Sequence, residues 1–294
     1  MIDPDRYIEM KRKRINRALQ NALPAAGPPV VIKAMRSSLE AGGKRLRPVL
    51  TLAAADTFGV DEHEVIEVAC AIEMVHTYSL IHDDLPAMDD SALRRGKPTC
   101  HRVFGEAVAI LAGDALLTHA FEVLARYGRK EFCAQKAVRI IDELAKAAGV
   151  EGMLGGQILD LEAEGKELTA EQIEKIYILK TGTMLKAAVR CGAIAAGASE
   201  SELVILTRFA SSLGTAFQIV DDLLDIEGTA EELGKPVGSD STHGKATYPA
   251  VFGCREASLK AEQFYRQAVE GLDELERPTE LLCSLADRIV FRKK

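Results

Sequence analysis

The stretch "HDDLPAMDD", His82–Asp90, places four aspartates around a proline and a few apolar residues. A second acidic stretch, "FQIVDDLLD", Phe217–Asp225, lies far downstream. Both stretches sit at or near the C-terminal ends of apolar segments that we expect to be helical. The helix dipole places partial negative charge at that end, so aspartates there need a positive charge to offset them. One such pair is usually solvated, but two pairs together indicate a binding site.

The first acidic stretch is not expected to be one continuous helix, because the ring of Pro86 clashes with the preceding turn. Asp83 and Asp89 are six residues apart, which is off the helical period. A loop after Pro86 would bring Asp89 back beside Asp83. We therefore expect these two carboxylates to act together.

The second acidic stretch keeps the helical period. Asp221 and Asp225 are four residues apart and project from one face, which Gln218 shares. Carboxylate oxygens suit hard cations such as magnesium, which retains waters and is usually shared with substrate phosphates. The two stretches therefore favour a phosphate-bearing substrate over a structural ion.

Basic residues that could meet a phosphate lie in two loops, "GGKRLRP" at 42–48 and "LRRGKPT" at 93–99. Arginine gives fork-shaped contacts to phosphate oxygens, and glycines let a backbone approach a ligand closely. "KTG" at 180–182 interrupts an apolar helix, and "GK" at 234–235 lies in a polar loop. Each run alone is typical of a solvated loop, and a lone helical histidine such as His76 is typical of core or surface. The basic candidates are Lys44, Arg45, Arg47, Arg94, Arg95 and Lys97.

Composition limits the class of protein. The chain has 294 residues and a net charge of −7, which argues against a nucleic-acid binder and against binding to an anionic membrane surface. Six scattered cysteines without a C-x-x-C pair favour reduced thiols in the cytoplasm. The N-terminus has no apolar signal region. The most apolar run, 107–125, is interrupted by Asp114, His119 and Glu122, so we expect no stable membrane insertion.

The chain is predicted to be all-α, because Ala, Leu, Glu, Lys and Ile dominate and alternating β-branched runs are absent. We expect one domain, 1–294. The polar, Gly-rich stretch 229–249 is interpreted as either a linker or a lid. The expected helices are about 5–22, 28–41, 46–58, 61–84, 101–127, 129–148, 169–197, 201–226, 247–272 and 278–291.

The motifs together resemble those of the trans-prenyl diphosphate synthases, most closely the bacterial farnesyl diphosphate type. The similarity spans about residues 40–250, and the spacing from Asp83 to Asp89 resembles the bacterial version with two inserted residues. In chain order, the matching motifs are "GGKRLRP", "HDDLPAMDD", "RRGKPT", "GGQILD", "KTG", "FQIVDDLLD" and "GKATYP".

The resemblance implies an isoprenoid synthase-type helical bundle around a deep central cavity, in a cytoplasmic homodimer. It implies magnesium as cofactor, which manganese can replace, held by Asp83, Asp84, Asp89, Asp221 and Asp225. It assigns Arg94, Lys180 and Lys235 to the allylic diphosphate, and Lys44, Arg47, His76 and Arg95 to isopentenyl diphosphate. Lys180, Thr181 and Gln218 would be catalytic, and the last two would line the cation region. Tyr78 and Ser79 would set chain length, and the tail "FRKK" would close over the homoallylic diphosphate.

The implied reaction joins isopentenyl diphosphate to dimethylallyl or geranyl diphosphate, giving mainly farnesyl diphosphate by ionisation, condensation and loss of a proton. The alternatives are a longer, geranylgeranyl product, or a class I terpene cyclase. Two features argue against the cyclase: the chain has no Trp to surround a cation, and it has a second set of basic residues that a cyclase does not need. A non-enzymatic metal-binding bundle is a further alternative, because "EMVH", Glu73–His76, has Glu-x-x-His spacing, although no second such motif accompanies it.

Overall fold

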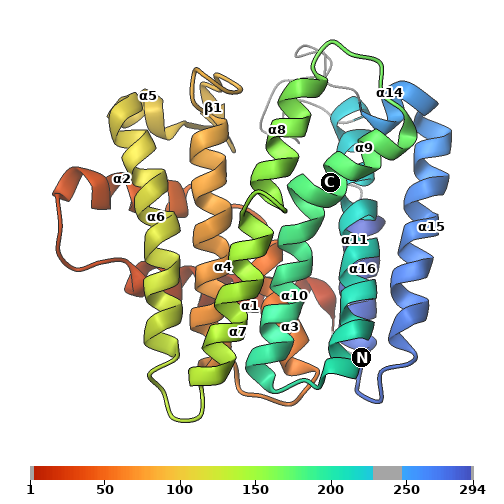
Figure 1. The fold of residues 1–294 in the computed structure, drawn as a ribbon, viewed down its shortest axis with the longest axis horizontal. Coiled ribbons are helices and arrows are strands. Elements are labelled where there is room, and N and C mark those ends of the chain that lie inside the picture. Colours follow the sequence, from red (N-terminus) through yellow and green to blue (C-terminus); the bar gives the residue numbers. More distant parts are fainter. Residues whose placement is uncertain (1–2, 228–246, 293–294) are drawn as a thin grey trace.

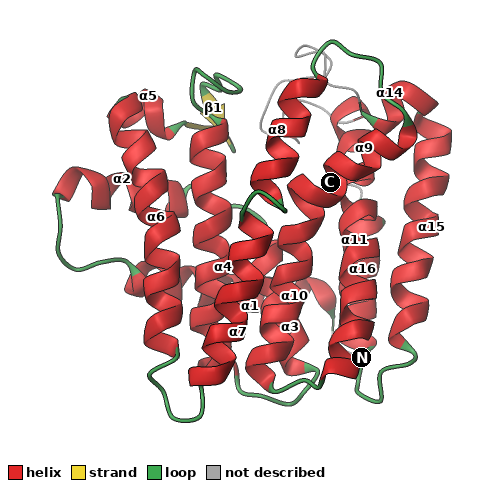
Figure 2. Cartoon of the chain, in the orientation of Figure 1, coloured by secondary structure: helices red, strands yellow, loops and turns green. Residues whose placement is uncertain are grey.

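The computed structural model describes residues 3–227 and 247–292, and nearly all of this part of the chain is helical (Figure 2). The all-α prediction is therefore confirmed. The elements are α1 (Pro4–Ala22), α2 (Pro29–Glu40), α3 (Leu46–Asp56), α4 (Glu62–Asp83), β1 (Leu93–Arg94), β2 (Lys97–Pro98), α5 (Cys100–Phe104), α6 (Glu106–Tyr127), α7 (Ala134–Ala148), α8 (Met153–Ala163), α9 (Ala170–Tyr177), the π-helical turn η1 (Ile178–Gly182), α10 (Thr183–Ala196), α11 (Glu200–Glu227), α14 (Tyr248–Phe252), α15 (Cys254–Leu272) and α16 (Glu280–Val290).

The long helices run side by side, with α4 and α10 in the interior (Figure 1). Helix α4 has buried residues on all sides, and Ile72, Met74 and Val75 are fully buried. A helix without a polar face belongs inside a bundle, which explains its central position. Helices α4 and α11 both end at the upper end of the bundle in Figure 1, and the β1–β2 hairpin lies next to the end of α4. The two acidic stretches therefore lie at the same end of the molecule.

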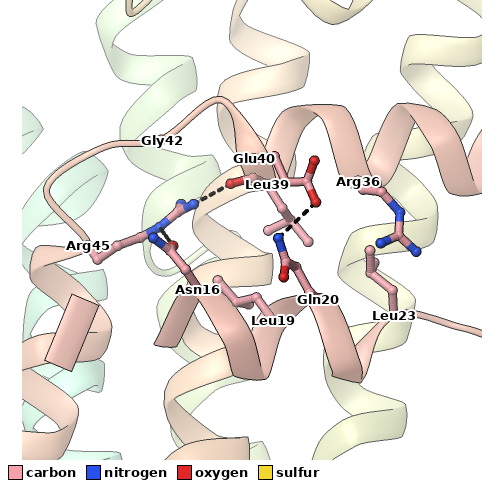
Figure 3. Close-up of a pocket in the computed structure, with 9 residues that line it drawn as sticks. All are labelled: Asn16, Leu19, Gln20, Leu23, Arg36, Leu39, Glu40, Gly42 and Arg45. Carbon is pink, nitrogen blue, oxygen red and sulfur yellow. Dashed lines mark hydrogen bonds between the residues drawn. The ribbon is translucent and has the colours of Figure 1, made fainter. Parts of the chain in front are cut away.

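A buried arginine joins the first four helices. Arg45 precedes α3 with a left-handed backbone (φ 51°). Its Nε donates to Asn16 Oδ1 of α1 at 2.9 Å, and its Nη2 donates to the Leu39 carbonyl of α2 (Figure 3). Its Nη1 lies 2.6 Å from Glu73 Oε1 of α4. Arg45 also borders a pocket of about 280 Å³ between α1 and α2. The buried ion pair between Arg45 and Glu73 therefore fixes the loop "GGKRLRP" to α4.

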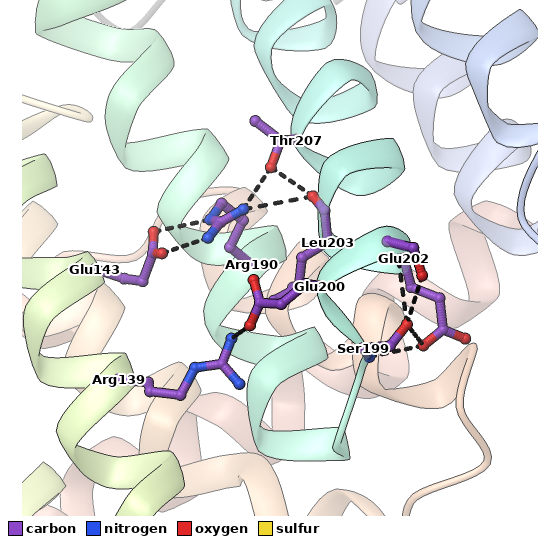
Figure 4. Close-up of polar contacts among 9 residues, drawn as sticks. Arg139, Glu143, Arg190, Ser199, Glu200, Glu202, Leu203 and Thr207 are labelled. Atoms are coloured by element: carbon purple, nitrogen blue, oxygen red, sulfur yellow. Dashed lines mark hydrogen bonds and ion pairs between the residues drawn. The ribbon is translucent and has the colours of Figure 1, made fainter.

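A second polar junction holds α7, α10 and α11 together away from the acidic stretches (Figure 4). Arg190 of α10 donates from Nε to Glu143 Oε2 of α7 at 2.8 Å and from Nη1 to Thr207 Oγ1 of α11 at 2.6 Å. Arg139 pairs with Glu200 at the start of α11. These contacts are remote from the motifs and have a structural role.

Several expected boundaries were wrong. The predicted helix 101–127 is divided at Gly105, whose φ of 84° is a conformation that side chains other than glycine's rarely adopt. The predicted helix 247–272 is divided in the same way at Gly253, and 169–197 is interrupted by η1. Helix α8 was not predicted, because its three-glycine neighbourhood has low helix propensity. The two-residue strands of the hairpin were also missed.

Three described helices, α4, α6 and α11, are long and apolar enough to cross a membrane by length and composition. The expectation that the run 107–125 is too interrupted to do so is therefore not supported. In the bundle, 67% of the apolar window of α4 and 56% of that of α11 are buried, so packing accounts for much of this hydrophobicity. The absence of membrane insertion stays a prediction.

Candidate active site

The first acidic stretch folds back on itself as predicted. Asp83 is the last residue of α4, and the Asp89 backbone N–H donates to the Asp83 carbonyl at 2.9 Å. Burial raises the pKa of the Asp83 carboxyl to about 6, against the opposing effects of Lys180 and Arg94. Asp89 and Asp84 raise it further. A half-buried carboxylate beside other carboxylates is costly to ionise, and a bound cation would remove that cost.

Asp84 differs from Asp83 in having a protein partner for both oxygens. Arg94 Nε lies 2.8 Å from Asp84 Oδ1 and 2.9 Å from Oδ2, and the carboxylate is almost fully buried. This pairing fixes the Arg94 guanidinium next to Asp83, where it can meet an anion. Asp84 thus orients Arg94 at the motif.

The two arginines of the β1–β2 hairpin contact different parts of the site. Arg94 turns towards the acidic stretch, whereas Arg95 Nη1 donates to the Gly42 carbonyl of the "GGKRLRP" loop. Arg94 is the last residue of β1, whereas Arg95 lies in the turn with a left-handed backbone (φ 55°), so the two side chains leave the chain in different directions. The short hairpin therefore links the acidic stretch to the basic loop.

A cluster of basic residues lies around that loop. Arg47 Nη1 is 3.3 Å from His76 Nε2. Burial, followed by the charges of Arg47 and Arg95, holds the pKa of His76 well below its ordinary value. The neutral His76 ring can then accept the Arg47 hydrogen bond. Burial also lowers the pKa of Arg47 and of Arg95, so a bound anion would stabilise their charged forms.

The second acidic stretch contacts Arg292, the last residue that the structure describes. Arg292 Nη2 lies 2.9 Å from Asp221 Oδ1, and its guanidinium lies over the Phe217 ring at 4.5 Å. Burial and the charge of Arg292 lower the pKa of Lys44, so Lys44 faces the same region. Asp225, one helical turn after Asp221, is buried. Residues 293–294 of the predicted closing tail lie outside the described residues, as does Lys235.

The turn η1 carries two of the predicted catalytic residues. Lys180 Nζ lies 2.6 Å from Asp160 Oδ2 of α8. Thr181 Oγ1 donates to Gln218 Oε1 at 2.8 Å, so this predicted pair is brought together. Asp160 was not recognised as a partner, although it ends the quoted motif "GGQILD". Only the packing of α8 on η1 reveals the contact.

The two chain-length candidates have different environments. Tyr78 is buried, with its ring edge-on to His82 at a centroid distance of 5.7 Å. Its hydroxyl has no hydrogen-bond partner among the described residues, and burial raises its pKa to about 12. Ser79 Oγ donates to the His76 carbonyl of its own helix at 2.9 Å. That Tyr78 limits chain length stays a prediction.

The described residues contain no group of three or more His, Cys, Asp or Glu side chains close enough to hold a metal by themselves. Magnesium sites usually use one or two carboxylates plus substrate phosphates. The adjacent Asp83 and Asp89 fit such a shared site, and Asp221 stays a predicted further ligand. Their all-oxygen donors and the raised pKa of Asp83 are compatible with a hard divalent cation.

The structure argues against "EMVH" as a metal-binding motif, because both of its expected ligands have other partners. Glu73 is paired with Arg45, and His76 faces Arg47. A carboxylate neutralised by a buried guanidinium is a poor metal ligand. The motif therefore supports the basic loop.

Comparison with known proteins identifies the class of protein. The polyprenyl synthetase family model matches residues 28–282. The chain is 48% identical over 265 residues to a farnesyl diphosphate synthase of Bacillus subtilis (strain 168), covering 90% of each chain. It is 46% identical over 300 residues to the farnesyl diphosphate synthase of Escherichia coli (strain K12), covering 100% of each. A crystal structure of geranylgeranyl pyrophosphate synthetase from Pyrococcus horikoshii Ot3 superposes with a TM-score of 0.87 at 34% identity, covering 97% of both chains.

The chain therefore belongs to the polyprenyl synthetase family and has the isoprenoid-synthase helical fold. It is an enzyme of prenyl transfer, because the family is enzymatic and generally depends on divalent metal ions and isoprenoid diphosphates. The resemblance inferred from the sequence motifs is confirmed.

Proposed function

We propose that the enzyme condenses isopentenyl diphosphate with dimethylallyl or geranyl diphosphate and releases mainly farnesyl diphosphate. The observation that supports this proposal is the presence of two groups of basic residues, one at Asp83 and one at the "GGKRLRP" loop, joined by the β1–β2 hairpin. Arg94 and Lys180 lie at Asp83, whereas Arg95 joins Arg47 and His76 at the basic loop. Two diphosphates need two such regions, and a terpene cyclase needs only one.

The assigned residues have distinct tasks. Arg94 and Lys180, with Lys235 from outside the described chain, bind the allylic diphosphate. Lys44, Arg47, His76 and Arg95 bind isopentenyl diphosphate. Thr181 and Gln218 border the carbon that becomes positive when the allylic C–O bond breaks. The isopentenyl double bond attacks that carbon, and released pyrophosphate can accept the proton that is lost.

Magnesium, or manganese in its place, would be held by Asp83, Asp89 and Asp221, supported by Asp84 and Asp225, and would stabilise charge on the departing pyrophosphate. The carboxylates alone would repel a diphosphate, and the neighbouring arginines offset only part of that charge. The cavity that holds the allylic chain must keep water from the reacting carbon, because water would quench the cation.

Product analysis tests the proposal directly. The enzyme is incubated with both diphosphates and magnesium, and the dephosphorylated products are separated by chromatography. Farnesol should dominate. Hydrocarbon formed from one allylic diphosphate without isopentenyl diphosphate would identify a cyclase, and a dominant twenty-carbon product would favour the geranylgeranyl alternative.

Exposed apolar side chains support a homodimer. Leu111 of α6 and Ile158 of α8 are 55% and 56% exposed, and Ile110 and Leu154 are also open. Such side chains usually gain from association. All six cysteines are free, which fits the proposed cytoplasmic location. A single-chain mass in light scattering would exclude the dimer.

Arg47→Ala is expected to raise the Michaelis constant for isopentenyl diphosphate about 10- to 100-fold, because it removes a charged phosphate contact. The constant for the allylic diphosphate should change little. Kinetics with each substrate varied in turn measure the difference. Lys97→Ala is the matched control, since the Lys97 ammonium donates to the Glu40 carbonyl at 3.2 Å, outside the assigned residues. Equal effects on both constants would contradict the assignment of the basic loop.

Tyr78→Ala is expected to shift products towards twenty carbons or more. The five residues from Tyr78 to Asp83 span about 7.5 Å of helix, the right order for a tail of two to three isoprene units. A bulky ring at that depth stops growth, because packed interiors tolerate little overfilling.

Tyr78→Phe is the control for that experiment. It keeps the ring and removes a hydroxyl that has no partner in the described structure. Its product profile should match that of the wild type. If folded, active Tyr78→Ala also made the wild-type products, another residue would form the floor.

A further inference from the structure

The second acidic stretch contains an aspartate that the proposed metal chemistry does not use. Asp221 is exposed and meets Arg292, whereas the next residue, Asp222, is only 4% exposed. Successive residues of a helix are rotated by about 100°, so the two carboxylates point in different directions. Asp222 faces into the bundle, towards η1 and α9.

The Asp222 carboxylate fixes a predicted catalytic side chain. Gln218 Nε2 lies 2.9 Å from Asp222 Oδ1, and Gln218 Oε1 accepts from Thr181 Oγ1 at 2.8 Å. Asp222 Oδ1 accepts from the Gln218 amide nitrogen, so the Gln218 NH₂ faces Asp222. The amide oxygen must then face Thr181. Asp222 therefore sets the position of both side chains at the cation region.

The other oxygen of the Asp222 carboxylate accepts a hydrogen bond from Tyr177, the residue just before η1. Tyr177 Oη donates to Asp222 Oδ2 and accepts from the Tyr248 backbone N–H at 2.8 Å. Tyr177 directly precedes η1, which carries Lys180 and Thr181. One buried acid thus joins α11, η1 and the beginning of α14.

Close glycine contacts hold η1 on two further sides. A Cβ atom at Gly156 of α8 would lie 2.2 Å from the Lys180 backbone nitrogen, and one at Gly214 of α11 would lie 2.9 Å from Gly182 Cα. The backbone of η1 is therefore clamped between neighbouring helices. Single π-helical turns are frequent at functional sites because they re-aim side chains.

We infer that Asp222 is a positioning residue for the transfer reaction, acting through Gln218 and Tyr177 on Thr181 and Lys180, and not through the metal. This inference rests on the proposed function. A misplacement of catalytic groups by about 1 Å can reduce turnover about 100-fold. Loss of Asp222 should therefore lower turnover without changing the demand for metal.

Asp222→Asn tests the inference, because it keeps the size but replaces one accepting oxygen by a donor. We expect its kcat to fall about 10- to 100-fold. Its magnesium concentration for half-maximal rate should stay within about twofold of wild type, because no direct metal ligand is lost. Tyr177→Phe should change kcat in the same direction with the same metal profile. Asp221→Asn, in contrast, should raise the magnesium requirement.

Two controls separate positioning from loss of stability. Tyr265→Phe removes a comparable Tyr–Asp hydrogen bond, to Asp287, at the surface and should leave kcat unchanged. In a Thr181→Val background, Asp222→Asn should add little to the loss, because both changes act on one group. Rates are normalised to folded protein.

The outcomes are distinct. A raised magnesium requirement in Asp222→Asn, an unchanged kcat, or full additivity with Thr181→Val would overturn the inference. A wild-type enzyme that does not condense the two diphosphates would instead overturn the proposed function.

Discussion

Asp83→Asn is expected to reduce turnover about a thousandfold, which corresponds to about 4 kcal/mol of transition-state stabilisation. The substitution keeps the size of the side chain and removes the charge proposed to hold the metal. Asp83 is the last residue of α4, and desolvation raises the pKa of its half-buried carboxyl to about 6. Steady-state rates at saturating substrates measure the loss. A chelator in excess should abolish the wild-type activity, and magnesium or manganese should restore it.

Asp90→Asn is the matched control, because it makes the same chemical change in the same stretch. The Asp90 side chain is 58% exposed and pairs with Arg102 at 3.2 Å. Its φ of 43° suits asparagine well. Its rate should stay within about threefold of wild type, as for an exposed ion pair. Near-normal turnover of Asp83→Asn, or of wild type in chelator, would contradict the metal assignment.

The helical fold was predictable because helix-forming residues and apolar spacing act locally. The ends of α1, α3 and α4 lie within two residues of the expected ends. The interruptions of the predicted helices at Gly105, at Gly253 and at η1 were not predictable, because they depend on contacts with other elements. Helix α8 forms in spite of its glycines, since Gly156 lets it touch the Lys180 backbone.

The candidate site was predicted in part. Spacing around Pro86 correctly predicted that Asp89 returns to Asp83. The sequence placed Gln218 on the face of Asp221, but its hydrogen bond runs to Asp222, four residues on. Ion pairs between residues far apart in the chain could not be predicted from sequence spacing. The separation from Lys180 to Asp160 is 20 residues and that from Arg292 to Asp221 is 71 residues.

Glu73→Ala is expected to lower the free energy of unfolding by about 3–5 kcal/mol, because it leaves a buried guanidinium without its counter-charge. Arg45 and Glu73 side chains are 3% and 2% exposed. Water cannot readily replace the lost carboxylate. Urea unfolding and the shift in Tm measure the loss.

The chain supplies a matched exposed pair as control. Arg208 and Glu274 are 51% and 57% exposed, so Glu274→Ala should cost at most about 1 kcal/mol. The double variant Arg45→Met/Glu73→Leu should lose less than Glu73→Ala alone, because no buried charge is left unpaired. Similar losses for Glu73→Ala and Glu274→Ala would contradict the role of burial.

Glu73→Ala should also affect the binding of isopentenyl diphosphate. Glu73 opposes the lowering of the pKa of Arg47 and of Arg95, and its partner Arg45 fixes the loop that Arg95 contacts at Gly42. Folded Glu73→Ala should therefore have a raised Michaelis constant for isopentenyl diphosphate and a nearly normal one for the allylic diphosphate. An equal rise in both would mean that the buried pair supports the whole bundle and not the basic loop in particular.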